Sequence, residues 1–178
     1  MGHSTSKKFT GQVIHDFIYS KGGRLMLLKG KIDLTTTIEI EKVWNHLLNP
    51  QVLLSCIPGA EKVEQIDKDT YHCVVKQKIG PVSATVKFKA SLNNMQPPKH
   101  MEFEGQGEVL GGLGHFTQKS TVDLTQTDNG GVAVAYVADI RIGGKLASFG
   151  DRIFRAKATE IEKELVNRLD AALKGLTG

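Results

Sequence analysis

The side chains that could do chemistry are scattered along this sequence and form no recognisable catalytic motif. Its six histidines include no His-Glu-x-x-His pair and no Cys/His spacing typical of zinc, so we predict no metal site. Cys56 precedes a turn and has no nearby base in the sequence, which a nucleophilic thiol would need. We interpret Cys56 and Cys73 as buried thiols. We therefore predict no catalytic residue and no cofactor, and a protein that is not an enzyme.

Asp139 is the best candidate for a catalytic acid, because it is an acidic residue in the middle of a predicted strand. Its neighbours Ala138 and Ile140 fit the inner face of a sheet, so we expect the Asp139 side chain to point toward water. An enzyme acting on a hydrophobic small molecule remains an alternative. A carboxylate or histidine facing the interior would favour it.

Two glycine-rich segments resemble phosphate-binding loops at first sight. Gly111, Gly112 and Gly114 lie between two predicted strands, without a helix N-terminus to receive an anion, so we interpret them as a turn. The segment Gly143-Gly144-Lys145 lacks the first glycine and the Ser or Thr that a P-loop requires. We interpret it as a sharp turn into a long helix, which Gly150 should thin where the helix crosses the sheet.

Length and composition indicate one domain without a nucleic-acid partner. With 178 residues, 40% of them hydrophobic, the chain can bury a full core. Its net charge of +4 is scattered, and an aromatic content of 6% argues against a basic, aromatic-lined groove for nucleic acid. A transient contact with an anionic membrane surface stays open. No signal peptide is recognisable and no apolar run approaches ~20 residues, so we predict a cytoplasmic protein.

The hydrophobic pattern predicts an antiparallel sheet closed by a long helix. A half-buried strand begins at Leu27, and two short helices follow it at about 38–48 and 51–55. Six further strands are predicted at about 61–66, 70–79, 82–92, 100–107, 115–126 and 131–142. The connections between them are too short for parallel crossovers, so the strands must pair antiparallel. The last element is an amphipathic helix from about Lys145 to Lys174, whose apolar side should pack on the sheet.

Four local strings resemble the carbon monoxide dehydrogenase G-subunit family, within the helix-grip superfamily that includes START domains and Bet v 1 allergens. They are Val43-Trp44, the run from Asn49 to Glu61, Lys78-Ile79-Gly80-Pro81-Val82, and the run from Ile142 to Gly150. The resemblance covers roughly Met26 to Leu173. It implies a non-catalytic accessory partner of a molybdenum-containing hydroxylase of the carbon monoxide dehydrogenase type, with a cavity that accommodates a quinone or lipid.

Pattern and resemblance together predict an α+β helix-grip fold of the START/Bet v 1 type. We expect a curved antiparallel β-sheet of about seven strands wrapped around a long C-terminal helix, with two short helices after the first strand. We divide the chain into an N-terminal extension of unknown role over 1–25 and a helix-grip domain over 26–178.

We predict an apolar pocket between the sheet and the long helix. Its wall and mouth should include Ile57, Pro58, Tyr71, Phe88, Phe103, Tyr136, Leu146, Phe149 and Ile153. The loops that we expect to gate it contain Gly59, Gly111, Gly112, Gly114, Gly143 and Gly144. Polar side chains predicted to face inward could orient a carbonyl or hydroxyl of a ligand; they are Tyr71, Cys73, Gln77, Gln118, Ser120 and Tyr136.

The predicted function is therefore a non-catalytic binding or carrier protein. Its expected partners are an apolar small molecule, quinone- or lipid-like, and a molybdenum hydroxylase complex. Besides the enzyme named above, a ligand-free assembly factor is a second alternative, and a filled core would favour it.

Overall fold

Seven strands build one antiparallel sheet in residues 23–176, the part of the chain that the computed structural model describes. The strands are β1 (Arg24–Leu34), β2 (Ala60–Asp67), β3 (Thr70–Ile79), β4 (Val82–Gln96), β5 (His100–Val109), β6 (Gly114–Gln126) and β7 (Val132–Gly143). The helices are α1 (Ile40–Leu47), α2 (Pro50–Cys56), the 3-10 helix η1 (Lys145–Ser148) and α3 (Asp151–Lys174). Strands β2 to β7 pair in chain order, and β1 pairs with β7.

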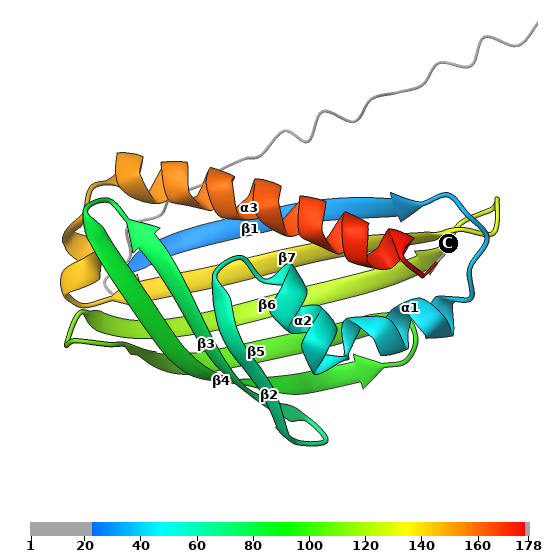
Figure 1. Ribbon diagram of the computed structural model, residues 1–178, viewed down its shortest axis with the longest axis horizontal. Helices are drawn as coiled ribbons and strands as arrows, with labels where there is room; N and C mark the ends of the chain where they lie inside the picture. The colour runs from blue at the N-terminus through cyan, green and yellow to red at the C-terminus, as the bar shows by residue number, and fades with distance from the viewer. Residues whose placement is uncertain (1–22, 177–178) are drawn as a thin grey trace, which may run out of the picture.

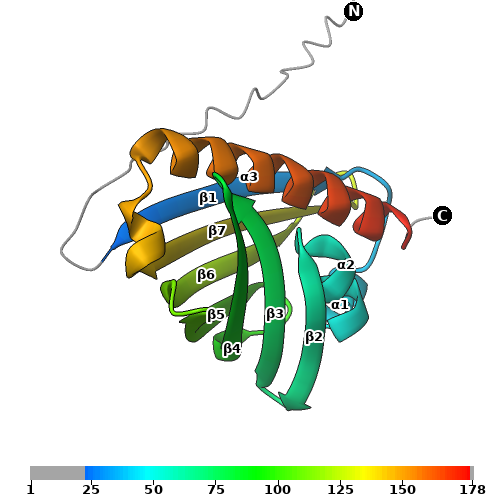
Figure 2. The same cartoon turned by 60° about the vertical axis from the view of Figure 1, so that its left-hand side comes forward.

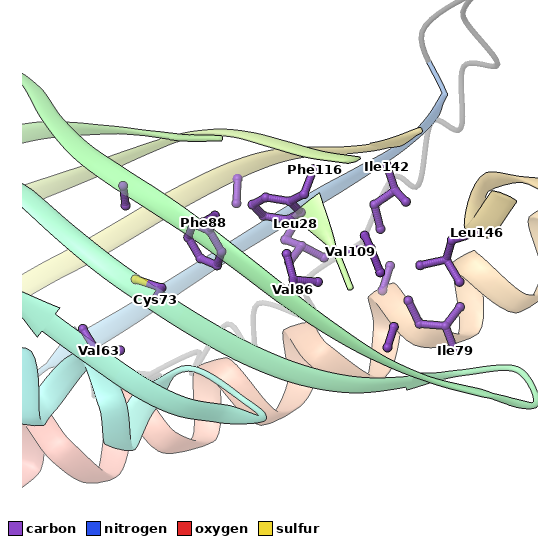
Figure 3. Close-up of a cluster of buried hydrophobic side chains, with 14 of the residues drawn as sticks. Leu28, Val63, Cys73, Ile79, Val86, Phe88, Val109, Phe116, Ile142 and Leu146 are labelled. Carbon is purple, nitrogen blue, oxygen red and sulfur yellow. The ribbon is translucent and has the colours of Figure 1, made fainter. Parts of the chain in front are cut away.

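The inner face of the sheet follows from the alternation of apolar and polar residues along each strand. In β4, Val86, Phe88 and Ala90 are buried, whereas Lys87 and Lys89 between them are exposed. The sheet curves so that its inner face looks toward α3 (Figures 1 and 2). Figure 3 shows Val86 and Phe88 among the side chains that meet in the resulting core.

Helix α3 lies along β1, one edge of the sheet, and covers the concave side (Figure 2). Helix α2 packs between β2 and α3, where the Cys56 Sγ lies 3.9 Å from the carbonyl oxygen of Arg168. The start of α2 is fixed locally, because the side chain of Asn49 accepts a hydrogen bond from the Gln51 N–H and Pro50 follows as the first helical residue. Helices α1 and α2 lie at one end of the concave side of the sheet (Figures 1 and 2).

The predicted α+β helix-grip architecture is confirmed, with seven strands in the expected chain order. Strand β1 begins at Arg24 rather than Leu27, because Arg24, Leu25 and Met26 already pair with β7. The Arg24 side chain also binds the segment that follows β7. Its Nε donates to the carbonyl oxygen of Ala147 at 2.9 Å, and its guanidinium pairs with Asp151. Residues 24 and 25, which we placed in the extension, are thus part of the sheet. Residues 1–22 lie outside the described part of the chain.

The prediction of one continuous helix from Lys145 to Lys174 is wrong. The segment is interrupted at Phe149 and Gly150, whose backbones are extended, so η1 and α3 are separate. Gly150 precedes the first residue of α3 and does not thin a helix at a crossing. The break arises because η1 is tied to the β5–β6 turn, where the Leu146 N–H donates to the carbonyl oxygen of Leu113 at 2.8 Å. None of the helices within 23–176 is long and apolar enough to span a membrane.

Candidate functional site

A cavity of about 260 Å³ lies between the concave face of the sheet and α3. Every strand and the helices α1, α2 and α3 contribute to its lining, and none of the lining side chains is charged. Pockets for drug-sized ligands usually measure about 300–1,000 Å³, whereas an apolar cavity of about 150 Å³ is enough for benzene. The cavity therefore has room for one or two rings, or for a short part of a longer apolar molecule.

The cavity exists because small residues occupy the middle of the concave face. Ala90 in β4 is the register partner of Gly105 in β5, and Ser120 in β6 is the partner of Ala138 in β7. The space over Gly105 itself is occupied, because a Cβ added there would lie 3.2 Å from the ring of Phe88. The short side chains of Ala90, Ser120 and Ala138, which line the cavity, leave space beneath α3.

Six of the nine predicted wall residues line this cavity. They are Ile57, Pro58, Tyr71, Phe88, Phe103 and Tyr136. They come from the α2–β2 connection and from strands β3, β4, β5 and β7, so the fold brings together residues far apart in the sequence. Their role in ligand binding remains a prediction.

Leu146, Phe149 and Ile153 do not line the cavity, and their predicted role in ligand binding stays a prediction. Leu146 is fully buried in η1, and Ile153 lies beside the β3–β4 turn, where its Cδ1 is 3.2 Å from a Cβ built at Gly80. The break at Phe149 and Gly150 places these residues at the end of the sheet, beyond the hollow. Their place is taken by α3 residues further along the same apolar stripe, namely Ile161, Leu165 and Leu169.

None of the six predicted gating glycines lines the cavity. Gly59 follows the lining residue Pro58, whereas Gly111 and Gly112 are exposed in the β5–β6 turn. Gly114, Gly143 and Gly144 allow strand ends to approach closely, since a Cβ at Gly144 would lie 2.6 Å from the Cα of Gly114. The glycine pair does make the predicted turn out of β7, with a φ of 86° at Gly144. Gating by these loops remains a prediction.

One side of the cavity lies between the end of α2, strand β3 and α3. Ile57, Val75, Gln77, Ile161 and Leu165 line the cavity there and are only half-buried. Helix α3 packs mainly on β1 and touches β3 much less. On this side of the cavity, α3 is therefore joined less closely to the sheet than it is along β1.

Most polar side chains of the lining already have partners. The Tyr71 hydroxyl donates to the carbonyl oxygen of Leu48 at 2.8 Å, and the Gln77 amide donates to that of Pro58 at 2.7 Å. The amide of Gln118 donates to the Ser120 hydroxyl at 2.7 Å. The lining therefore combines a large apolar area with a few hydrogen-bonding groups, as binding pockets generally do.

Both cysteines line the cavity and are buried as free thiols, as predicted. Burial raises the pKa of Cys73 to about 11. Burial also raises the pKa of Cys56, although the Ser55 hydrogen bond and the Arg168 charge oppose the shift. Since the thiolate is the reactive form, neither residue is an activated nucleophile at neutral pH.

Glu162 is the buried carboxyl group that sequence reasoning missed. It is 7% exposed and accepts a hydrogen bond from the backbone N–H of Lys29, while its Oε2 has no partner among the described residues. The hydroxyl of Tyr136 is buried without a partner there as well. Burial raises the pKa of both groups, and the nearby Glu162 charge adds to the rise at Tyr136. The spacing of Glu162 from Ala158, four residues, places it in the buried stripe and could have identified it.

Asp139 points to the outer face, as predicted, where its carboxylate lies 3.3 Å from the Nε of Arg141. Within residues 23–176, no three His, Cys, Asp or Glu side chains come together in a group that could hold a metal ion.

Comparisons with known proteins agree with this architecture. A family model described as the carbon monoxide dehydrogenase G subunit (CoxG) matches residues 30–174. A conserved protein from Geobacillus kaustophilus has a similar structure, with a TM-score of 0.71 and 25% identity over 86% of this chain and 98% of that chain. None of the curated proteins matches.

Two more distant structures show the fold alone. A START superfamily protein from Mycobacterium smegmatis has a TM-score of 0.61 and 10% identity, covering 85% of this chain and 99% of that one. The ZhuI aromatase/cyclase from Streptomyces sp. R1128 has a TM-score of 0.59 and 12% identity, covering 85% and 96%.

Proposed function

Because the chain belongs to the CoxG family, we propose that it is a non-catalytic accessory protein that binds an apolar, quinone- or lipid-like molecule beneath α3. The supporting observation is the cavity of about 260 Å³ inside the core, lined without a charged side chain. Protein interiors are normally close-packed, so such a hollow is the best candidate for a binding site. Burial of apolar ligand surface at ~25 cal/mol per Å² would supply the affinity.

The chemistry of the lining supports binding rather than catalysis. The thiols of Cys56 and Cys73 are held in their protonated form by burial, which raises the pKa of each. Asp139, the acid considered first, lies on the outer face beside Arg141. The remaining polar groups suit the orientation of a ligand, because neutral hydrogen bonds select geometry without creating a reactive charge.

The proposed partner of the complex is a molybdenum hydroxylase of the carbon monoxide dehydrogenase type, as family membership suggests. A transient contact with an anionic membrane surface is consistent with the net charge of +4. The two free cysteines suit a reducing compartment, which supports a cytoplasmic location.

Native mass spectrometry of the purified protein tests the binding function, together with uptake of added apolar compounds. We expect a bound apolar molecule, and we expect Ala138→Leu to reduce its occupancy by filling the hollow. Ala135→Leu is the matched control, since Ala135 lies on the opposite face of the same strand. Absence of uptake by the native protein, or unchanged uptake by the Ala138→Leu variant, would contradict the proposal.

One observation favours the enzymatic alternative, namely the buried carboxyl of Glu162 beside Tyr136, and one protein of similar fold is an aromatase/cyclase. Glu162 does not line the cavity, however, and its carboxyl is held by the Lys29 N–H. Glu162→Gln keeps the shape and removes the acid. If the native protein converts a bound compound, and Glu162→Gln still binds that compound but no longer converts it, the enzymatic alternative is established.

A further inference from the structure

Helix α2 is held at both of its ends by side chains of a single strand, β3. The Tyr71 hydroxyl donates to the carbonyl oxygen of Leu48, just before α2, at 2.8 Å. The Gln77 amide donates to the carbonyl oxygen of Pro58, just after α2, at 2.7 Å. Both donors also line the cavity, so the hydrogen bonds that fix α2 are made from within the cavity wall.

The segment between these two hydrogen bonds covers part of the cavity but is shallowly buried itself. Its cavity-lining residues are Leu53, Cys56, Ile57 and Pro58. Among the α2 residues only Cys56 is buried, whereas the apolar side chains of Val52 and Leu54 are half-buried. Helix α2 packs on the edge strand β2 and on α3 (Figures 1 and 2). Little apolar packing therefore has to be broken to move α2.

Helix α3, which also covers the cavity, is attached more firmly. Its residues Phe154, Ala158 and Leu173 are fully buried. At its N-terminal end, Asp151 pairs with Arg24 of β1. Local opening of a protein follows the route that breaks the fewest buried contacts. Movement of α2 is therefore a less costly way to open the cavity than movement of α3.

The chain can turn on both sides of α2. Asn49 and Ile57, which flank the helix, have extended backbones, and Gly59 has a φ of 75°. The carbonyl oxygen of Gly59 accepts a hydrogen bond from the Lys76 N–H at 2.8 Å, which fixes the following chain to β3. Hinges are typically a few such positions at the ends of elements. Residues 50–58 can therefore swing as one unit while the sheet stays in place.

We propose that residues 50–58 form a lid over the cavity, which Tyr71 and Gln77 hold closed and which opens to let apolar molecules enter and leave. This inference rests on the proposed binding function and names how access to that site is controlled. Each of the two hydrogen bonds is neutral, so loss of one should increase the open population about two- to tenfold. The open lid admits and releases a ligand alike.

The accessibility of the Cys56 thiol tests the lid without any ligand, because Cys56 belongs to α2 and is buried against the cavity. Labelling of the full-length protein with N-ethylmaleimide is followed for this cysteine by peptide mass spectrometry. We expect Tyr71→Phe and, separately, Gln77→Met to accelerate the labelling of Cys56 about two- to tenfold.

Stopped-flow fluorescence with prodan, a neutral two-ring fluorophore, tests whether the same motion controls access. We expect the association and dissociation rates of prodan to rise by a similar factor in Tyr71→Phe and in Gln77→Met. The dissociation constant should change less than either rate, because an opening step affects entry and release equally. A lost contact with the ligand would instead act mainly on dissociation.

Tyr136→Phe and Gln118→Met are the matched controls. They make the same chemical changes in the cavity wall, but the Tyr136 hydroxyl has no partner among the described residues and the Gln118 amide donates to Ser120, so neither holds α2. Both should keep the native rates of Cys56 labelling and prodan exchange.

Circular dichroism shows which variants are folded, and one folded β3 variant with its control suffices. Native rates in the β3 variants, or an equal acceleration in the controls, would overturn the lid while the binding function stands. Failure of the native protein to bind prodan or any other apolar compound would overturn the binding function, and the lid with it.

Discussion

The ring of Tyr136 in β7 lies over Gly30, its register partner in β1. A Cβ at Gly30 would come within 2.5 to 2.6 Å of the Cε1, Cζ and Oη atoms of the tyrosine. The glycine thus provides the space in which the ring lies. The Tyr136 hydroxyl is buried there, close enough to Glu162 of α3 for the carboxylate charge to raise its pKa. One small residue on an edge strand therefore positions part of the cavity wall.

Gly30→Ala should displace the Tyr136 ring and destabilise the protein, because the added methyl overlaps three ring atoms. Overpacking of this kind typically costs about 1–3 kcal/mol. Urea unfolding measures the change. Combining Gly30→Ala with Tyr136→Val should recover part of the loss, since the valine no longer reaches over β1. If the losses of unfolding free energy caused by Gly30→Ala and Tyr136→Val simply add in the double variant, the contact between residue 30 and the Tyr136 ring is contradicted.

Glu162 should make the protein less stable as the pH rises. Burial raises its pKa in the folded state, so its contribution to stability is fully present below the unfolded pKa and is lost as the pH increases through the folded value. Glu162→Gln should remove this part of the pH dependence and match or exceed the native stability at neutral pH. Glu162→Ala should cost about 1–3 kcal/mol, because the Lys29 N–H loses its acceptor. Unfolding free energies measured from acidic to neutral pH check the expectations for both variants. If the unfolding free energies of the native protein and of Glu162→Gln depend on pH in the same way, the burial of the acid is contradicted.

His100 should titrate above the usual histidine range. Its hydrogen bonds to Asp123 at 2.6 Å and to Glu102 at 3.1 Å raise the pKa of the imidazole. The stability that this cluster adds is therefore complete below the unfolded pKa of the histidine and disappears as the pH rises through the folded value. Proton NMR of the imidazole follows the titration directly. Asp123→Asn should lower the pKa, and an unchanged value would show that the pair does not persist in solution.

The two thiols should react slowly with Ellman's reagent in the folded protein. Cys56 and Cys73 are buried, and the pKa of Cys73, raised to about 11, leaves little thiolate near pH 8. We expect rates at least about tenfold below those of the urea-unfolded chain, and a further decrease when an apolar compound fills the cavity. If the thiols react fast, and at a rate that added ligand does not change, they do not line the cavity.

The order of the strands and the inner face could be predicted because they follow from local rules. The alternation of apolar and polar residues along β4 determines that Val86 and Phe88 face the interior. The connections between consecutive strands are short, so the strands pair antiparallel. The predicted wall residues that lie on strands, such as Phe103 and Tyr136, do line the cavity, because the same alternation determines which way their side chains point.

The helical side of the cavity could not be predicted in the same way. The apolar stripe after Lys145 is continuous in the sequence, whereas the break at Gly150 depends on contacts with Leu113 and Arg24 from distant segments. The position of the break decides that Ile161 rather than Ile153 faces the hollow. The burial of Glu162 could have been inferred from its spacing from Ala158, whereas its role as an acceptor could not, since that role depends on a backbone N–H of β1.

The central claim is that an apolar molecule binds between the concave sheet and α3. Methyl NMR of isoleucine-labelled protein during a titration with 1-tetralone tests it directly. We predict saturable shifts of the cavity-lining Ile57, Ile140 and Ile161, while Ile66 on the surface and Ile153 at the start of α3 stay unchanged. Absent shifts, or shifts that spread over Ile66 and Ile153 without saturation, would contradict binding in this cavity.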